Sequence, residues 1–248
     1  MIGNKERLQR LRGTQKGKRA WIIGNGPSLR RAPLRSLHEL GEHSFAVNRI
    51  ASIYHETKWR PTYYSCTLQD ITGFGDKLDF VIDILTAIHE APFAFIGEWL
   101  QHQIGQPHNV TWLKEFRPYK QVIRQVDCHP YYSKDPTNGV NISRSLIVPI
   151  QIADFMGYDP IILLGCDGHY SAGHINNHMR EDYVAISDLN YEWDVDREND
   201  LQRQMHEIVR SSCPKVKNGT DGGIVENYPR VDPFEILGVE KPLDGDLW

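Results

Sequence analysis

Residues 21–29, Trp-Ile-Ile-Gly-Asn-Gly-Pro-Ser-Leu, have the composition of a turn that binds a phosphate or a nucleotide. Gly24 and Gly26 let backbone N–H groups approach a ligand, and Pro27 suits the first position of a helix. Ser28 adds a hydroxyl at the positive end of that helix. The spacing is neither G-x-G-x-x-G nor G-x-x-x-x-G-K-[ST], so it supports neither a dinucleotide fingerprint nor a P-loop ATPase. Ligand binding and a purely structural turn both remain open for this loop alone.

Polar residues also stand at other points where apolar runs end or helical stretches begin. They are Asn25, Asn48, Arg49, Thr137, Asn138, Gly139 and Asp167. An asparagine offers a donor and an acceptor together, which suits a nucleobase edge or sugar hydroxyls, and an arginine can offset a phosphate. Each residue alone is more typical of a turn. Their expected convergence at one edge of a sheet predicts a nucleotide site.

Three histidines, His169, His174 and His178, fall within ten residues, beside Asp167 and Tyr170. Their spacing matches no compact zinc signature and no cysteine accompanies them, so we expect no metal ion there. A histidine with a pKa near 6.5 can instead take a proton from an attacking hydroxyl at neutral pH. A plain surface position is the remaining alternative for each of them.

Short apolar runs rich in β-branched and aromatic residues alternate with helical patterns. The expected strands are 20–23, 44–47, 62–66, 93–96, 110–113 and 161–164. Such alternation predicts an α/β fold, a Rossmann-like and mainly parallel sheet flanked by helices. Ligands bind such sheets at the carboxyl ends of the strands, which is where the polar residues stand.

Helical periodicity predicts a helix over 142–156, with Ile142, Leu146, Ile150 and Ala153 on one face. Pro149 should kink it, and Gly157 should end it. A second helix is expected over 195–210. Residues 215–229 indicate a turn-rich C-terminal hairpin with Gly222 and Gly223 at its tip.

The chain divides into four expected parts of one domain. Residues 1–19 form a basic helical leader, 20–167 the nucleotide-binding core, 168–195 a lid or active-site loop, and 196–248 a C-terminal helix and tail. The leader holds seven Lys or Arg and one Glu, whereas the remaining residues carry a net charge of 21 minus 31, or −10. A solvated or self-docked leader is favoured over one that contacts lipid or nucleic acid.

The composition is typical of a soluble globular protein, with 40% hydrophobic and 24% charged residues. No apolar run is long enough to cross a bilayer, and the charged N-terminus is no secretory signal. The cysteines are scattered without a C-x-x-C pair, which predicts free thiols in a reducing, cytoplasmic setting. They are Cys66, Cys128, Cys166 and Cys213.

Seven motifs resemble those of bacterial and phage proteins similar to the archaeal 6-hydroxymethylpterin diphosphokinase. They are Ile-Ile-Gly-Asn-Gly-Pro-Ser-Leu at 22–29, Val-Asn-Arg at 47–49, Thr-Asn-Gly-Val at 137–140, Leu-Gly-Cys-Asp at 164–167, Asn-Asn-His-Met at 176–179, Asn-Gly-Thr-Asp-Gly-Gly at 218–223 and Tyr-Pro-Arg-Val-Asp at 228–232. The resemblance spans residues 17–237. The first half also resembles the bacterial sialyltransferases of glycosyltransferase family 42, which share the Asn-Gly-Pro-Ser-Leu loop.

The sialyltransferase resemblance implies a Rossmann-like sheet that uses a CMP-activated sugar without a metal or other cofactor. It implies that Asn25 and Ser28 contact the nucleotide and that Asn48 approaches it. Thr137, Asn138 and Gly139 would line the sugar–phosphate site. Tyr170 would contact the leaving phosphate, although it lies one residue further from Asp167 than the pattern requires. His178 matches the general base.

These observations favour a metal-independent glycosyltransferase that moves a sugar from a nucleotide-activated, CMP-type donor to a hydroxyl of a glycan or another acceptor. A nucleic-acid acceptor is left open, as is a homo-oligomeric state. One alternative is a diphosphokinase-like enzyme, with Mg²⁺ on Asp167 and Asp70. Its flat aromatic pocket would draw on Trp59, Tyr63, Tyr64 and Trp193. The other alternative is a non-catalytic nucleotide- or nucleic-acid-binding protein that uses the basic leader.

Overall fold

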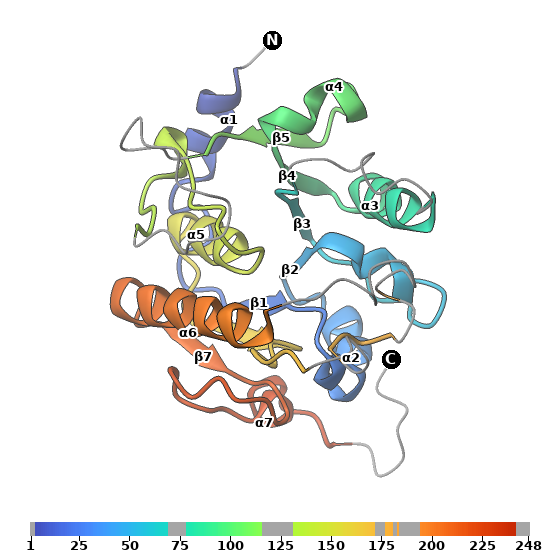
Figure 1. Ribbon diagram of the computed structural model, residues 1–248, viewed down its shortest axis with the longest axis vertical. Helices are drawn as coiled ribbons and strands as arrows, with labels where there is room; N and C mark the ends of the chain where they lie inside the picture. The colour runs from blue at the N-terminus through green and yellow to red at the C-terminus, as the bar shows by residue number, and fades with distance from the viewer. Residues whose placement is uncertain are drawn as a thin grey trace.

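Seven parallel strands form the centre of the molecule, with helices on both faces of the sheet (Figure 1). The computed structural model describes residues 3–68, 78–115, 131–171, 177–180, 183 and 194–241. The strands follow the order β5-β4-β3-β2-β1-β6-β7, and every neighbouring pair is parallel. Their bounds are β1 (Ala20–Ile23), β2 (Ser44–Val47), β3 (Tyr63–Cys66), β4 (Phe93–Gly97), β5 (Val110–Leu113), β6 (Ile161–Leu164) and β7 (Val216–Asn218). The structure thus confirms the expected α/β class.

Alternate strand residues feed two hydrophobic cores, one on each face of the sheet. Trp21 and Ile23 of β1 face one core, and Ala20 and Ile22 face the other. In Figure 1, α1, α5 and α6 lie to the left of the strands, whereas α2 and α3 lie to the right. The helical elements are α1 (Asn4–Leu11), η1 (Pro27–Arg31), α2 (Leu34–Glu39), η2 (Asn48–Ile53), α3 (Leu78–Glu90), η3 (Glu98–Leu100), α4 (Gln101–Ile104), η4 (Pro136–Asn138), α5 (Ile147–Met156), α6 (Val195–Ser212) and α7 (Pro233–Leu237).

The strand order reverses beside β1, which pairs with β2 on one side and β6 on the other. Ile23 at the end of β1 stands opposite Ala46 and Leu164. The chain leaves β2 toward one edge of the sheet and β6 toward the other. Loops therefore diverge at the carboxyl ends of β1 and β6, which is the usual ligand crevice of an open α/β sheet.

The expected C-terminal hairpin is wrong. β7 runs parallel to β6 at the edge of the sheet, and the isolated bridge from Asn218 to Arg230 is also parallel. The loop between them is held from within, because the Asn218 amide donates to the Val225 carbonyl at 2.7 Å. Gly222 and Gly223 do adopt positive φ, at +85° and +71°, but they turn a loop rather than a hairpin.

The expected helix over 142–156 is shorter in the structure, because α5 begins only at Ile147. Pro149 is its third residue, where a backbone N–H has no partner within the helix, so the ring removes no hydrogen bond and kinks nothing. Gly157 ends the helix in the left-handed conformation, as expected, with φ of +92°.

The basic leader docks on the body of the protein. Leu8 of α1 is buried, and Arg7 donates to the Val110 carbonyl of β5 at 3.1 Å. Arg12 pairs with Asp135 beside η4 at 2.8 Å, and the Gly13 N–H donates to Phe155 of α5. The helix therefore continues the layer that α5 begins.

Several expectations fall outside the described residues. Most of the expected lid does so, as do Asp70, Cys128, His174 and Trp193. Cys66, Cys166 and Cys213 are free and buried, as expected. Among the helices that the structure describes, none combines the length and the apolarity needed to cross a membrane.

Candidate functional site

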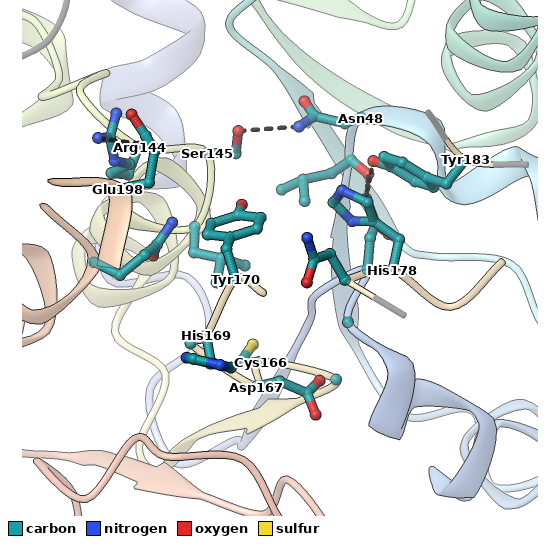
Figure 2. A pocket seen from close by; sticks show the side chains of 18 of the residues that line it. Asn48, Arg144, Ser145, Cys166, Asp167, His169, Tyr170, His178, Tyr183 and Glu198 are labelled. Carbon is teal, nitrogen blue, oxygen red and sulfur yellow. Dashed lines mark hydrogen bonds and ion pairs between the residues drawn. The ribbon is translucent and has the colours of Figure 1, made fainter. Parts of the chain in front are cut away.

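A cavity of about 390 Å³ opens at the carboxyl ends of β1, β2 and β6 (Figure 2). It lies at the switch point of the sheet, and its walls come from segments far apart in the sequence. The lining residues with side chains suited to chemistry are Asn25, Asn48, Ser143, Arg144, Ser145, Asp167, His169, Tyr170, Asn177, His178, Tyr183, Glu198 and Gln202. Of the residues expected at the site, Asn25, Gly26, Asn48, Asp167, Tyr170 and His178 are therefore brought together.

Asn25 extends from the loop after β1, and its amide is locked in one orientation. Nδ2 donates to the Val47 carbonyl at 3.0 Å and to the Tyr183 hydroxyl at 2.8 Å. The two glycines around it serve the protein rather than a ligand. Their N–H groups donate to the carbonyls of Leu164 and Gly165, at 2.8 and 2.9 Å. The expected ligand-binding role of these amides is therefore wrong, and Gly24 does not line the cavity.

Ser28 is turned away from the cavity and is only 2% exposed. Its hydroxyl donates to Asp167 Oδ2 at 2.7 Å, and its N–H points at the same oxygen at 3.3 Å. Pro27 does begin a helix, but the carboxylate of Asp167 fills the position at its start where we expected a nucleotide phosphate. Gly26 makes this possible, because a Cβ atom there would collide with the carboxylate. Burial raises the pKa of Asp167, while the bonds from Ser28 oppose the rise.

Asn48 directly follows β2 and adopts φ of +50°, a left-handed conformation that asparagine tolerates better than most residues. The Tyr64 hydroxyl donates to its carbonyl at 2.9 Å. Its side chain points across the cavity in Figure 2, where Nδ2 donates to Ser145 Oγ at 3.0 Å. Asn48 thereby spans the two halves of the crevice.

Arg49 does not reach the cavity, contrary to its expected role as a phosphate contact. It is 8% exposed, and its guanidinium binds Asp83 of α3, with 2.7 Å between Nε and Oδ2. A second nitrogen donates to the carbonyl of Tyr183. The Asp83 carboxylate holds the Arg49 guanidinium away from the cavity because it offers both charge and hydrogen bonds.

Thr137, Asn138 and Gly139 also lie away from the cavity. Thr137 and Asn138 belong to η4 and Gly139 follows it, and Asp135 caps this short helix by accepting from the Thr137 N–H and hydroxyl at 3.1 and 2.7 Å. The structure places residues 142–146 at the cavity instead. Arg144 and Ser145 were not predicted, and the available signal was a polar pair two residues before a buried helix.

Arg144 forms an ion pair with Glu198 of α6 at the cavity wall, with 3.2 Å between Nη2 and Oε2. Tyr170 stands beside them, and its backbone is tied to Asn199 of α6 by two hydrogen bonds of 2.7 and 3.0 Å. Desolvation raises the pKa of Tyr170, and the charge of Glu198 raises it further. The phenol therefore stays protonated at neutral pH, and it shares a side-chain hydrogen bond with Gln202, another residue of the cavity lining.

His178 lines the cavity opposite Arg144 (Figure 2). Its ring stacks on Tyr183 with 4.0 Å between ring centroids and 22° between planes. The Tyr170 ring lies 6.1 Å away, edge to face. His169 also lines the cavity and is exposed. The imidazole of His178 therefore has one covered face and lies within the same cavity as the Tyr170 phenol.

The aromatic residues considered for a pterin pocket are placed elsewhere. Trp59, Tyr63 and Tyr64 are buried in the two cores, and none of them lines the cavity. Within the described ranges, no three His, Cys, Asp or Glu side chains are grouped so as to hold a metal ion.

Comparisons with known proteins find a similar fold but no matching family. No protein-family model matches the chain, and no curated protein matches it. Among solved structures, the MAF glycosyltransferase from Magnetospirillum magneticum AMB-1 superposes with a TM-score of 0.53 at 10% sequence identity. The likeness shows a shared fold. It covers 98% of this chain and 40% of the glycosyltransferase, so the chain spans about two fifths of that protein's length.

Proposed function

We propose that this protein is a glycosyltransferase that moves a sugar from a nucleotide-activated donor to a hydroxyl acceptor. One observation carries the proposal: His178, Asn48, Arg144, Ser145 and Tyr170 meet in one cavity at the switch point of the sheet. They supply a proton acceptor and several donors in the place where such folds bind ligands. The structural neighbour, a glycosyltransferase, supports the same reaction class.

His178 is the proposed general base. A sugar that leaves an activated donor passes through an oxocarbenium-like transition state, and the acceptor hydroxyl must lose a proton as it attacks. A neutral imidazole takes that proton at physiological pH. Stacking on Tyr183 holds one face of the ring, and the Tyr170 ring lies edge to face with it inside the cavity where the acceptor would bind.

Arg144, Ser145 and Tyr170 are the proposed contacts of the departing phosphate. Arg144 and Ser145 lie just before Leu146, the residue that precedes α5. The N–H of Ile147 donates to the Arg144 carbonyl at 3.2 Å, and the following N–H groups of the first turn have no partner within the helix. Helix N-termini favour anions, and hydrogen bonds from an arginine or a phenol strengthen as charge develops on the leaving oxygen. This trio replaces Thr137, Asn138 and Gly139 in the role that the sequence resemblance implied.

A CMP-type donor, with a single phosphate, is the proposed substrate class. Among the described lining residues, Arg144 is the one Lys or Arg, and Glu198 offsets part of its charge. Asp167 adds a carboxyl to another part of the lining. A diphosphate would bring more negative charge than this wall can balance without a metal ion. Catalysis without a metal is therefore part of the proposal.

The diphosphokinase-like and non-catalytic alternatives give different results in one binding experiment. The purified protein is screened by thermal shift against CMP, UMP, GMP, ADP, ATP and their sugar conjugates, in EDTA and then with Mg²⁺. A ligand at 100 times its Kd adds about 2.7 kcal/mol of stability. Stabilisation by CMP or a CMP-sugar in EDTA supports the proposal. Stabilisation by ATP only with Mg²⁺ favours the diphosphokinase, and no shift with any nucleotide favours the binding protein.

With the donor in hand, His178→Ala tests the base. We expect transfer to fall by roughly 10²- to 10⁴-fold, the usual contribution of general base catalysis. His89→Ala is the matched control, because His89 is 87% exposed on α3. Full activity of His178→Ala would remove His178 from the mechanism.

A further inference from the structure

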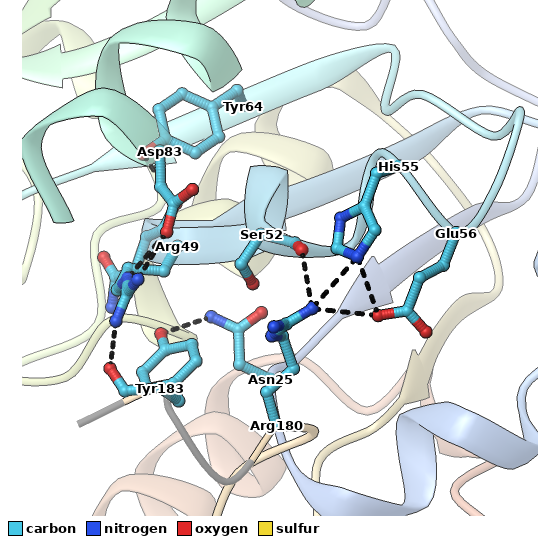
Figure 3. A network of polar contacts seen from close by, with 10 residues as sticks. Asn25, Arg49, Ser52, His55, Glu56, Tyr64, Asp83, Arg180 and Tyr183 are labelled. Carbon is cyan, nitrogen blue, oxygen red and sulfur yellow. Dashed lines mark hydrogen bonds and ion pairs between the residues drawn. The ribbon is translucent and has the colours of Figure 1, made fainter. Parts of the chain in front are cut away.

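Two backbone carbonyls close to His178 are each bound by an arginine from another part of the chain. Arg30 of η1 donates from Nε to the Met179 carbonyl at 2.7 Å. Arg49 of η2 donates from Nη1 to the Tyr183 carbonyl (Figure 3). Neither arginine lines the cavity. The backbone on the C-terminal side of His178 is thus held by two arginine side chains, one at Met179 and one at Tyr183.

Each arginine is itself held by a carboxylate. Arg30 pairs with Glu56 at 3.3 Å, and Arg49 pairs with Asp83 at 2.7 Å. The Arg49 pair is largely buried, with side chains 9% and 15% exposed, whereas Arg30 is 50% exposed. A guanidinium presents several N–H groups in a fixed fork, so it can bind a carbonyl and a carboxylate together.

Arg180, two residues after His178, joins the same cluster. It donates to Glu56 at 3.0 Å and to the Ser52 carbonyl at 3.3 Å (Figure 3). Glu56 therefore receives a cation from η1 and a cation from the histidine segment. This shared carboxylate fastens the segment to the residues that follow η2.

Asn25 completes the support on the side of the cavity. Its carbonyl accepts from the Met179 N–H at 2.8 Å, and Met179 is only 2% exposed. Its amide donates to the hydroxyl of Tyr183, whose ring lies against His178. Backbone and ring contacts therefore restrain the imidazole along its chain and on one face.

We propose that Arg30 and Arg49 are positioning residues that hold the His178 imidazole at the cavity. The catalytic part of this inference rests on the proposed function. A general base must lie within hydrogen-bond reach of the proton it removes, and a displacement of about 1 Å can cost on the order of 100-fold in rate. Asp83 balances the charge of Arg49, whereas Glu56 is shared by Arg30 and Arg180, so the cluster keeps one net positive charge.

Arg30→Ala tests the more exposed of the two arginine contacts, and Arg35→Ala is its matched control. Arg35 is 58% exposed and pairs with Glu39 within α2, away from the histidine segment. The first measurement is backbone hydrogen exchange of a peptide that covers residues 177–183, which requires no substrate. We expect several-fold faster exchange in Arg30→Ala and no change in Arg35→Ala. Arg30→Lys should be intermediate, because one ammonium cannot reproduce the fork.

The second measurement is steady-state transfer with the donor found in the screen. We expect kcat of Arg30→Ala to fall on the order of 10- to 100-fold, with KM for the donor within about two-fold. Arg49→Lys, which keeps a cation beside Asp83, should change both readouts in the same direction. A loss of donor affinity with unchanged kcat would contradict a role in positioning the base.

The two proposals fail in distinguishable ways. If exchange over 177–183 stays unchanged in both Arg30→Ala and Arg49→Lys, the two arginines do not restrain this segment and the inference is overturned. If exchange rises in both variants while the wild-type protein turns over no donor, the arginines do restrain the segment and the transferase proposal is wrong. If exchange rises and kcat is unaffected, the segment is held for a reason other than catalysis, and the positioning role is wrong.

Discussion

Asp167 is a carboxylate that the protein uses to close its own strand-to-helix turn. A buried acid costs free energy when it ionises, which is why burial raises its pKa. Ser28 supplies a hydroxyl and an N–H to one carboxylate oxygen, and these bonds offset part of the cost. Asp167 lines the cavity, whereas Ser28 lies behind it, away from the cavity. Stability near this turn therefore depends on a single hydroxyl.

Ser28→Ala should destabilise the protein by about 1–3 kcal/mol at pH 8, the range for a hydrogen bond to a charged group. A carboxyl with a raised folded pKa contributes less stability as pH rises through that pKa, and loss of the hydroxyl raises the pKa further. The deficit relative to wild type should therefore shrink as the pH is lowered toward 4. Urea unfolding at both pH values measures it.

Ser211→Ala is the control, because its exposed hydroxyl bonds only to carbonyls of its own helix. We expect a change within about 0.5 kcal/mol at either pH. A deficit in Ser28→Ala that does not depend on pH would show that the protonation of Asp167 does not change over this range, which would contradict the expected coupling.

Residue types at strand ends were predictable, but the directions of their side chains were not. Asn25, Asn48 and His178 line the cavity, as their positions after apolar runs or within a motif indicated. Ser28 and Arg49 stand in equally suitable places and turn away. Their partners, Asp167 and Asp83, come from distant parts of the chain. Sequence spacing holds no information about such a pairing.

At the scale of elements, α1 is a short, mostly polar helix. A single buried leucine and nearby arginines together hold it in place. Leu8 reaches the core shared with α5, and Arg7 and Arg12 bind β5 and the region of η4. An isolated helix of this length would be marginal in water. Its stability must therefore come from docking.

Leu8→Ala should lower the free energy of unfolding by about 2–5 kcal/mol, the usual cost of emptying a buried leucine site. Arg10→Ala is the matched variant in the same helix, because Arg10 forms only an exposed pair with Glu6. It should change stability by less than about 0.5 kcal/mol. Chemical denaturation of both variants makes the comparison. Equal effects would mean that Leu8 does not anchor the helix.

Elements with a strong local signal were predictable from the sequence, and those fixed by tertiary pairing were not. The runs that became β1, β2, β5 and β6 were found with their bounds. β7 was missed because three residues beside glycine-rich turns indicate a hairpin as readily as an edge strand. The start of α5 was missed because the apolar periodicity continues through the turn that precedes it.

At the scale of the whole molecule, His206 links overall stability to pH. It lies in α6, is 2% exposed, and its Nδ1 is 3.0 Å from the Tyr228 hydroxyl. Burial lowers its pKa to about 4. In the unfolded chain the pKa is about 6.5. Protonation therefore favours the unfolded state in the interval between these values.

The wild-type protein should lose about 2 kcal/mol of stability from this one group between pH 7 and pH 5. The contribution is complete above pH 6.5 and declines as the pH falls toward 4. His206→Phe removes the titration, so the difference in unfolding free energy between variant and wild type should move in favour of the variant over this range. Parallel pH dependences would contradict a lowered pKa at His206.

The central place of β1 sets an order of events during translation. Its pairing with β2 needs only the first 47 residues, but its other edge waits for β6, which begins 138 residues after β1 ends. At roughly 5–20 residues per second, that interval lasts about 7–28 s. Throughout it, the nascent chain carries an unpaired apolar edge that can associate with other chains. The crevice that makes a ligand site in the finished protein is therefore also the seam that closes late on the ribosome.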